Sequence, residues 1–487
     1  MRLSAKILEE NNMKKTLLLL LAAILVIVPV ITCTSCSKDE VDEKTNLTDE
    51  MEDDAFSPNI PAGTKFDGET FNFLIGSVGY LMYAEEETGD LLNDAVYRRN
   101  TLIAEHFGID LNIEKRGFNE SEGQGEATAL FRSLIESGDE TYNAFSQVQH
   151  SGMPQMMLEN YFVDWNTIPY INLEDNWWHQ KISDELSFGD KIYVMTGDYS
   201  IYLERTNCLV FNKDIFDELG LEYPYQDVLD GTWTFDKFSE LVKQGADDLN
   251  GDGLMTKEDD QWGFVGWTHE QTYALLASSG FTPLKRDADN LPVLNEDVET
   301  NHEIYGRIVD MFADGQSALA VMDDYASNIK VFTEGRAMFK DIFLGMITTY
   351  TDVEFDFGII PYPKWDEDSE YMSRSANMTP LTYIPVTNPN LELTGAVLEE
   401  MAYQSAKTVT PVYFDIVLTV KNTRDVESEA MLPIIRDSSR FMYEGFTPSI
   451  VMTVHGGTNN YASSYAANLS KYQEDLEEMR EYLTREE

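Results

Sequence analysis

The sequence predicts an α/β fold with a mainly parallel sheet, because strand and helix patterns alternate along most of the chain. Short apolar or alternating runs indicate the strands, and apolar residues at helical spacing indicate the helices between them. The chain has 487 residues, of which 43% are apolar, and so carries enough apolar side chains for two domain cores. No repeat of fixed period is visible, which argues against a solenoid.

The first stretch of alternation lies between residues 71 and 158. The expected elements are a buried strand at 71–76, a helix at 91–107, an alternating strand at 109–113, a helix at 127–135, a strand at 142–147 and a helix at 152–158. A strand that is followed by a helix and then by another strand is typical of parallel pairing.

A second stretch begins near residue 191. Strands are expected at 191–195 and 207–211, and helices at 215–219, 235–249 and 469–483. Asn212 and Thr234 stand where helix N-caps are expected. A further strand is expected after a turn at Gly335, and Pro361 and Pro363 should end another.

The N-terminus has the pattern of a secretory signal. Lys14 and Lys15 form a short basic stretch, and residues 17–31 are an apolar run of 15 residues. Such a run is shorter than the ~20 residues that a membrane-spanning helix needs, and it fits the apolar part of a signal peptide. We therefore expect residues 1–35 to be a signal peptide, with translation starting at Met1 or at Met13.

The apolar run ends at two cysteines that indicate lipidation. Ser35-Cys36 resembles a bacterial lipobox, and Thr32-Cys33 is a second register that stays open. Lipidation at Cys36 would hold the protein at the membrane by its lipid anchor alone. The alternative is a plain cleaved signal with incidental cysteines. Cys208 is then the remaining cysteine, so no intramolecular disulfide is expected.

Residues 36–65 are acidic and lack apolar periodicity, and we expect a disordered tether there. Acidic residues dominate the whole chain, whose formal net charge is −51 at pH 7. A field of this sign argues against nucleic acids and anionic lipid surfaces as partners.

One acidic loop has the ligand spacing of a calcium site. Its oxygen donors are expected to be Asp248, Asn250, Asp252, the Leu254 carbonyl and Asp259. Gly253 lies where such a loop turns sharply around a cation that takes six to eight oxygens. The segment resembles a single dockerin loop, and we expect a structural Ca²⁺ there; an acidic surface turn without metal is the alternative.

Several motifs in a characteristic order resemble the extracellular solute-binding proteins of family 1, the carbohydrate-type group. They include residues 197–216, the segment 231–236, the acidic loop with 260–263, residues 332–339 and 357–363, and residues 384–387. The similarity covers nearly all of residues 66–487.

This resemblance implies a two-lobe, periplasmic-binding-protein-like fold of type II with hinge crossings between the lobes. It places the N-lobe at 66–199 plus 380–410 and the C-lobe at 200–379 plus 411–487. It also implies closure on a small solute, most often a sugar, and delivery to the permease subunits of an ABC transporter. We expect a monomer at the extracellular face of the cytoplasmic membrane.

Ligands of open α/β sheets bind at the carboxyl ends of the strands. Sugars need aromatic faces for their C–H patches and planar polar groups for their hydroxyls. The ligand-binding residues expected on these grounds are Tyr80, Gln147, His150, Asp198, Tyr199, Trp267, Asp341, Phe343 and Tyr413.

Two other functions stay open. A carbohydrate-active enzyme is disfavoured, because the six histidines are scattered and the sequence has no HExxH, no nucleophile elbow and no phosphate-binding glycine loop. A surface lipoprotein that captures glycans without serving a transporter is the second alternative. The sequence does not identify the ligand.

Overall fold

The computed structural model describes residues 56–76, 82–116, 124–148, 152–200, 202–321, 325–376, 378–419, 426–441 and 459–484. The chain forms two units that divide after Glu52, and the fold described here belongs to the second, Asp53–Glu487. The expected signal peptide, Cys36 and the tether up to residue 55 lie outside the described residues, as do Tyr80 and His150. No helix in the described part is both long and apolar enough to span a membrane.

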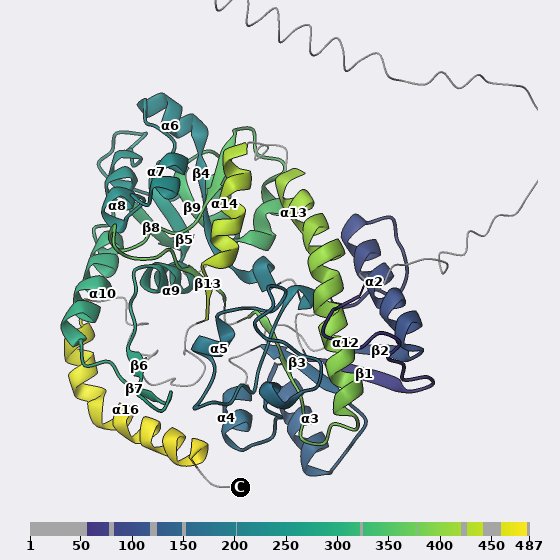
Figure 1. The fold of residues 1–487 in the computed structure, drawn as a ribbon. Helices are drawn as coiled ribbons and strands as arrows, with labels where there is room; N and C mark the ends of the chain where they lie inside the picture. The colour runs from purple at the N-terminus through teal and green to yellow at the C-terminus, as the bar shows by residue number, and fades with distance from the viewer. Residues whose placement is uncertain are drawn as a thin grey trace, which may run out of the picture. The chain divides into compact units, whose positions relative to one another are not determined.

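The first of two main sheets has the strand order β12-β3-β1-β2 (Figure 1). Its strands are β1 (Thr70–Ile75), β2 (Asp110–Lys115), β3 (Ala144–Val148) and β12 (Pro380–Tyr383). β1 lies parallel to both β2 and β3, and β12 runs antiparallel to β3. Its helices are α2 (Leu91–Phe107), α3 (Gln124–Glu136), α4 (Met153–Leu158), α5 (Ile182–Glu185) and α12 (Leu391–Gln404). We call this part the N-lobe.

The second main sheet has the order β10-β4-β9-β5-β8 and defines the C-lobe. Its strands are β4 (Asn207–Asn212), β5 (Trp262–Trp267), β8 (Ala318–Val321), β9 (Ala337–Phe343) and β10 (Phe357–Ile360). β5 is parallel to β8 and β9, whereas β4 is antiparallel to β9 and β10. Its helices are α6 (Lys213–Leu219), α7 (Tyr225–Asp230), α8 (Phe235–Gln244), α9 (Thr268–Ser278), α10 (Val298–Ala313), α11 (Tyr325–Thr333) and α14 (Val426–Asp437).

The remaining elements are short, apart from two helices. They are η3 (Trp165–Thr167), η4 (Asp198–Ser200), η5 (Tyr202–Arg205), β6 (Leu284–Arg286), β7 (Pro292–Leu294), η6 (Leu344–Tyr350), β11 (Ser373–Arg374), η7 (Ser405–Val409), α13 (Thr410–Thr419), β13 (Ser439–Arg440) and α16 (Tyr461–Leu483). β6 and β7 form an antiparallel hairpin, and β11 pairs with β13 in parallel.

Each lobe has its own apolar core. Phe73 and Phe145 on β1 and β3 belong to the N-lobe core, together with apolar residues of α12. Phe339 on β9 belongs to the C-lobe core, where Trp233 and Phe238 pack around it at ring-centroid distances of 5.9 and 5.2 Å. The mixed α/β class predicted from strand–helix alternation is therefore confirmed.

Within the residues that the structure describes, three passages between the lobes lie near the two sheets. Residues 198–207 lead from the N-lobe to β4, and residues 374–380 return from β11 to β12. Thr206 and Ser375 form an isolated antiparallel bridge where these two segments pass. The third passage is helical: α12 packs in the N-lobe core, η7 is a π-helical turn, and Val409 at its end packs in the C-lobe core.

Two predicted elements differ from the structure. Residues 191–195 are not a strand: Met195 forms only an isolated bridge to Thr382, and the amide of Ile192 donates to the Asp164 side chain. Residues 192–195 are apolar because they are buried although they form no strand. The helix predicted at 235–249 ends at Gln244, and Asp247 then pairs with Gln261 in an isolated bridge.

The expected tether also ends earlier than predicted, because residues 56–65 are part of the folded N-lobe. Ile60 lies in the N-lobe core. Ser57 donates from its hydroxyl to Glu399 (2.8 Å) and from its amide to Glu400 (3.0 Å). The polar groups of this segment therefore find buried hydrogen-bond partners in the carboxylates of α12. The acidic, polar composition of the segment gives no sign of these partners.

Candidate functional site

The two sheets meet the lobe junction at the edges where ligands of α/β proteins bind. In the N-lobe, Val148 at the carboxyl end of β3 pairs with Pro380, the first residue of β12 after a crossing. In the C-lobe, Phe343 at the carboxyl end of β9 pairs with Asn207, which directly follows the other crossing. The carboxyl ends of β3 and β9 therefore lie at the two sides of the junction.

Asp341 is the centre of a buried polar cluster at the C-lobe edge. Its Oδ1 accepts hydrogen bonds from the Tyr362 hydroxyl (2.6 Å) and from the Asn207 amide (3.3 Å). Arg374 donates to the Asn207 carbonyl oxygen (3.3 Å), and its guanidinium lies 5.2 Å from the ring centroid of Tyr273. This arrangement fixes the orientation of the carboxylate, as a binding site needs.

The neighbours of Asp341 on β4 and β9 are buried ionisable groups. Burial lowers the pKa of Lys340 to about 8, although the carboxylate of Asp341 opposes the shift. Burial also raises the pKa of the Cys208 thiol, with a smaller contribution from the Asp341 charge. Cys208 is a free, fully buried cysteine and is therefore an inert core residue.

The aromatic residues predicted at this edge lie beside the cluster. Trp267 is the last residue of β5 and pairs with Val321 of β8, and Phe343 is the last residue of β9. Both side chains are half-buried, whereas Asp341 is 5% exposed. The structure thus places Trp267, Asp341 and Phe343 at one edge of the sheet, with Asp341 and Phe343 on the same face of β9.

At the N-lobe edge the predicted residues are buried more deeply. Gln147 lies on β3, and its Oε1 accepts from the amide of Val148 (2.9 Å). Tyr199 is fully buried in the N-lobe core, and its hydroxyl donates to Thr382 (2.6 Å). Tyr199 has no exposed surface and belongs to the N-lobe core, and its contact with a ligand stays a prediction.

Asp198 and Tyr413 lie at the passages between the lobes. Burial raises the pKa of Asp198 to about 7, against the opposing effects of the Thr410 hydroxyl and the Arg436 charge. Tyr413 is 5% exposed on α13 and packs in the C-lobe core. Both residues thus line the hinge rather than the two sheet edges.

Sequence reasoning missed Asn207, Tyr362 and Arg374, the residues that orient Asp341. Tyr362 follows β10 in a segment whose prolines were interpreted as structural. Basic residues are few in this acidic chain, so an arginine such as Arg374 could have been singled out from the sequence. If its guanidinium is buried, it needs polar partners, which makes it a candidate for a polar cluster.

In the acidic loop, side-chain oxygens accept hydrogen bonds from the backbone amides of the same loop. The Asp248 carboxylate accepts from the amides of Gly251 (2.8 Å) and Gly253 (2.7 Å), and Asn250 and Asp252 each accept from the amide two residues on. The oxygen donors suit a hard cation. At the end of the loop the buried carboxylate is Asp260, which accepts from Leu249 and Thr256, while Asp259 is exposed.

No three His, Cys, Asp or Glu side chains converge as metal ligands in the described part of the chain.

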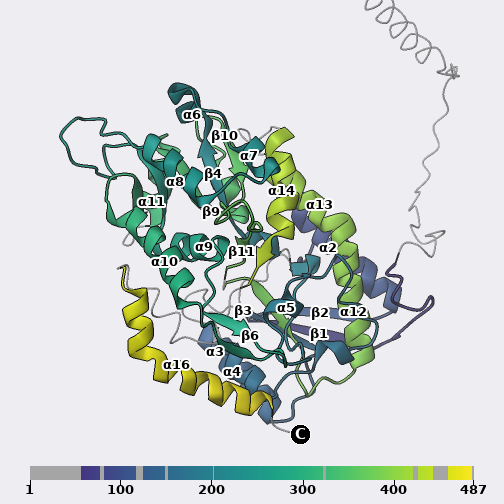
Figure 2. The ribbon, with the colours of Figure 1, turned by 60° about the vertical axis from the view of Figure 1, so that its left-hand side comes forward.

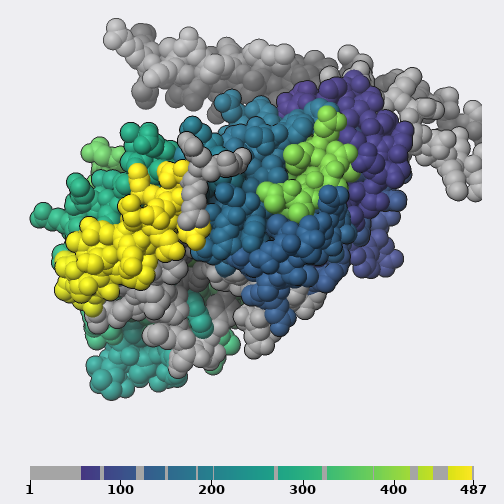
Figure 3. All heavy atoms as spheres, turned by 90° about the horizontal axis from the view of Figure 1, so that it is seen from below, coloured from purple at the N-terminus to yellow at the C-terminus, as the bar shows by residue number. Residues whose placement is uncertain are grey.

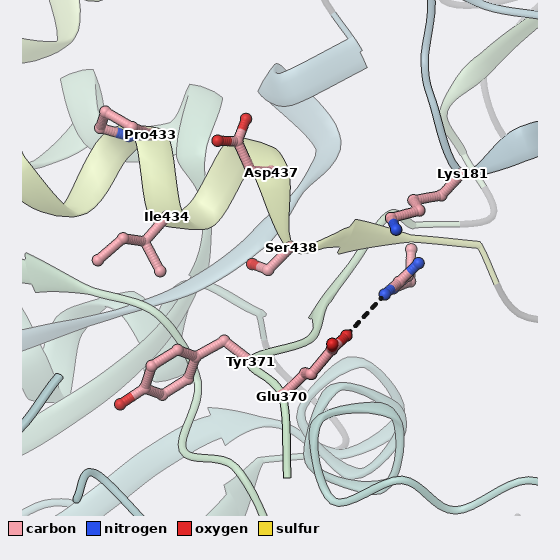
Figure 4. A pocket seen from close by; sticks show the side chains of 8 residues that line it. Lys181, Glu370, Tyr371, Pro433, Ile434, Asp437 and Ser438 are labelled. Atoms are coloured by element: carbon pink, nitrogen blue, oxygen red, sulfur yellow. Dashed lines mark hydrogen bonds and ion pairs between the residues drawn. The ribbon is translucent and has the colours of Figure 1, made fainter. Parts of the chain in front are cut away.

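A separate hollow of about 340 Å³ lies where the N-lobe meets β13 (Figure 4). It is lined by Lys181, Glu370, Tyr371, Pro433, Ile434, Asp437, Ser438 and Arg440. Arg440 forms ion pairs with Glu370 (3.4 Å) and with Glu185 of α5 (3.5 Å). Arg440 thus pairs with a carboxylate of the N-lobe across the lobe junction.

The fold, with two α/β lobes and three passages between them, is that of the two-domain periplasmic binding proteins. The family of bacterial extracellular solute-binding proteins matches residues 117–401, more than half of the chain. The chain belongs to this family. No curated protein sequence matches it.

Solved structures share the fold at low sequence identity. UspC of M. tuberculosis has a TM-score of 0.55 and 11% identity, over 84% of this chain and 100% of UspC. A cyclo/maltodextrin-binding protein complexed with maltotetraose has a TM-score of 0.53 and 13% identity, over 86% and 97% of the two chains. The GacH receptor of Streptomyces glaucescens, solved with acarbose, has a TM-score of 0.51 and 13% identity, over 87% and 100%.

Proposed function

We propose that this protein captures a mono- or oligosaccharide at the extracellular face of the cytoplasmic membrane and delivers it to the permease of an ABC transporter. The observation that carries the proposal is the edge of the second sheet, where the half-buried Phe343 lies two residues after the oriented Asp341 on the same face of β9. The half-buried Trp267 ends the neighbouring strand β5 at the same edge. An aromatic face beside a planar acceptor suits the C–H patches and hydroxyls of a sugar. Relatives in fold that were solved with maltotetraose and acarbose agree with this ligand class.

The test is a thermal-shift screen of the chain from Ser37 onward against mono- and oligosaccharides, followed by calorimetric titration of any hit. A true ligand at about 100 times its dissociation constant should stabilise the fold by about 2.7 kcal/mol. Asp341→Ala should abolish the shift, whereas Asp366→Ala, on an exposed loop of the same lobe, should retain it. Turnover of a sugar would instead favour the enzyme, and a panel without any shift would overturn the sugar proposal.

The proposal includes a lipid anchor at Cys36. Cys36→Ala, expressed in a bacterial host with a lipoprotein pathway and fed a labelled fatty acid, should lose the label and be released from the membrane fraction. Cys33→Ala is the matched control and should keep the label. The opposite result would move the anchor to Cys33.

We also propose a structural Ca²⁺ bound by Asp248, Asn250, Asp252, the Leu254 carbonyl and Asp259. The ordered oxygen donors of the loop support it. EDTA should lower the melting temperature and added Ca²⁺ should restore it, while Asp248→Ala should abolish the response to both. A melting temperature that EDTA leaves unchanged would end this part of the proposal.

A further inference from the structure

The two lobes contact each other a second time, away from the three hinge passages. The β6–β7 hairpin emerges from the C-lobe, where Leu284 and the preceding Phe281 are core residues. Its tip, residues 287–291, is closed by a hydrogen bond from the Asp287 amide to the Leu291 carbonyl (2.9 Å). Asn290 at the tip has a φ of +57°, a conformation in which Asn is among the more tolerant residues.

Arg286 at the end of β6 and Asn290 in the tip hold the N-lobe segment 187–189 through four hydrogen bonds. The Arg286 guanidinium donates to the Ser187 carbonyl (2.6 Å). The Asn290 side chain donates to the Ser187 hydroxyl (3.0 Å) and to the Gly189 carbonyl (2.5 Å). The Gly189 amide in turn donates to the Asn290 carbonyl (3.1 Å). Phe188, in the middle of this segment, belongs to the N-lobe core. The hairpin is therefore bonded to a segment that is firmly packed in the N-lobe.

The C-terminal helix α16 spans the same two lobes. Tyr461, Tyr465 and Leu476 pack in the C-lobe core. One turn further on, Met479 packs in the N-lobe core and Leu483 packs against it. Figure 3 shows α16, in yellow, lying beside the blue N-lobe surface.

An ion pair joins the helix to the hairpin. The Arg480 guanidinium lies 2.5 Å from the Asp287 carboxylate, and hydrogen bonds from Leu291 and Arg480 hold the pKa of Asp287 below its usual range. In both Figure 1 and Figure 2, α16 lies on the side of the lobes away from α12 and α13.

We propose that the β6–β7 hairpin and α16 form a latch that favours the closed arrangement of the two lobes and must open for the solute to enter or leave. The latch rests on the proposed function, because only a protein that binds between its lobes needs to open them. The contacts of the hairpin suit this role, because its hydrogen bonds to the N-lobe and its ion pair with α16 are polar and partly exposed. The apolar packing of Met479 and Leu483 adds a contact between α16 and the N-lobe.

The interlobe distance of the ligand-free protein tests the latch. Spin labels are placed on Ser137→Cys in the N-lobe and Ala313→Cys in the C-lobe, both exposed positions, while Cys208 is too buried to react. The chain from Ser37 onward carries this pair with or without Arg286→Ala and Asn290→Gly. Glycine keeps the left-handed tip while removing the side chain that bonds to the N-lobe.

We expect one narrow distance in the parent protein and a longer, broader distribution in the Arg286→Ala/Asn290→Gly variant. The ratio of open to closed molecules should rise about tenfold or more, as expected when a few ordinary hydrogen bonds are lost. Lys285→Ala is the matched control: it lies exposed on the same hairpin and should leave the distance unchanged.

A second variant, Arg480→Ala, removes only the ion pair and should broaden the distribution less. If the double variant unfolds, this milder variant decides the question. Distributions that coincide for the parent and both variants would overturn the latch. Since no sugar is present in the measurement, that outcome leaves the sugar proposal untouched, and a failed sugar screen leaves the latch untouched.

Discussion

The phenol of Tyr362 donates a 2.6 Å hydrogen bond to the carboxylate of Asp341, and both side chains are almost completely buried at the lobe junction. Tyr362 follows β10, and Asp341 lies on β9, so two strands that are not neighbours in the sheet contribute to one pair. A buried carboxylate held in this way is oriented before any ligand arrives, which lowers the entropic cost of binding.

Tyr362→Phe is therefore expected to reduce both stability and affinity. It leaves a buried carboxylate oxygen with one donor fewer, which costs about 1–3 kcal/mol in unfolding free energy. Urea denaturation measures the first effect, and titration with the sugar found by the screen measures the second. Tyr371→Phe is the control, since its hydroxyl donates to the Val228 carbonyl (3.0 Å) outside the cluster; an equal loss of affinity in both variants would contradict the role of Tyr362.

Asp198 should make the stability of the protein depend on pH. Its folded pKa of about 7 lies above the ordinary value of 3.8. The folded state therefore binds the proton more tightly, and this contribution to stability is complete below pH 3.8 and is lost as the pH rises through 7. Asp198→Asn removes the ionisation, so relative to the parent it should gain about 2 kcal/mol between pH 5 and pH 8.

Denaturant titrations of both proteins at several pH values check this. In the parent protein, His179 has the opposite effect on stability. Burial lowers its pKa to about 3, so the folded state holds this imidazole neutral and stability falls as the pH drops below about 6.5. The difference between the two proteins isolates Asp198. A difference that stays constant with pH would show that Asp198 titrates normally.

Gly263 is expected to tolerate no side chain. A Cβ atom built on this residue of β5 would lie 1.7 Å from the Val242 carbonyl oxygen of α8, so the helix would have to move off the sheet. Gly263→Ala should cost about 3 kcal/mol or more in unfolding free energy, at the upper end for overpacked cores. Gly125→Ala on α3 has open space and should be neutral or stabilising; similar behaviour of the two variants would contradict the predicted packing.

The sequence predicted the regular elements well where periodicity decides them. The helix expected at 91–107 has those bounds in the structure, and Asn212 and Thr234 are N-caps whose side chains accept from helix amides. The strand predicted at 191–195 was wrong, because a buried segment outside a sheet selects apolar side chains just as a buried strand does.

The candidate site was predicted only in part. Trp267, Asp341 and Phe343 were predicted because they come near the ends of expected strands, and the structure places them near the carboxyl ends of β5 and β9, with Asp341 and Phe343 inside β9 and not after it. That they bind a ligand stays a prediction. Arg374, by contrast, orients Asn207 across 167 positions of sequence, a contact that no local pattern encodes. For the same reason the latch could not be predicted: Arg286 and Ser187 are 99 positions apart and lie in different lobes.

Glu399 is expected to hold the start of the folded chain against α12. Its carboxylate accepts from the Ser57 hydroxyl (2.8 Å), the Asn59 amide (2.8 Å) and the indole nitrogens of Trp177 (3.1 Å) and Trp178 (3.0 Å). Glu399→Gln places an amide hydrogen where a donor already points, so at least one buried bond is lost. The variant should lose about 2 kcal/mol of stability, and limited proteolysis should cut near residue 57 faster than in the parent. Glu392 is exposed on the first turn of the same helix, so Glu392→Gln is the control. It should change the unfolding free energy by no more than about 0.5 kcal/mol and leave the rate of cleavage near residue 57 unchanged. Equal cutting rates in all three proteins would mean that the carboxylate does not anchor the segment through which the proposed lipid tether joins the N-lobe.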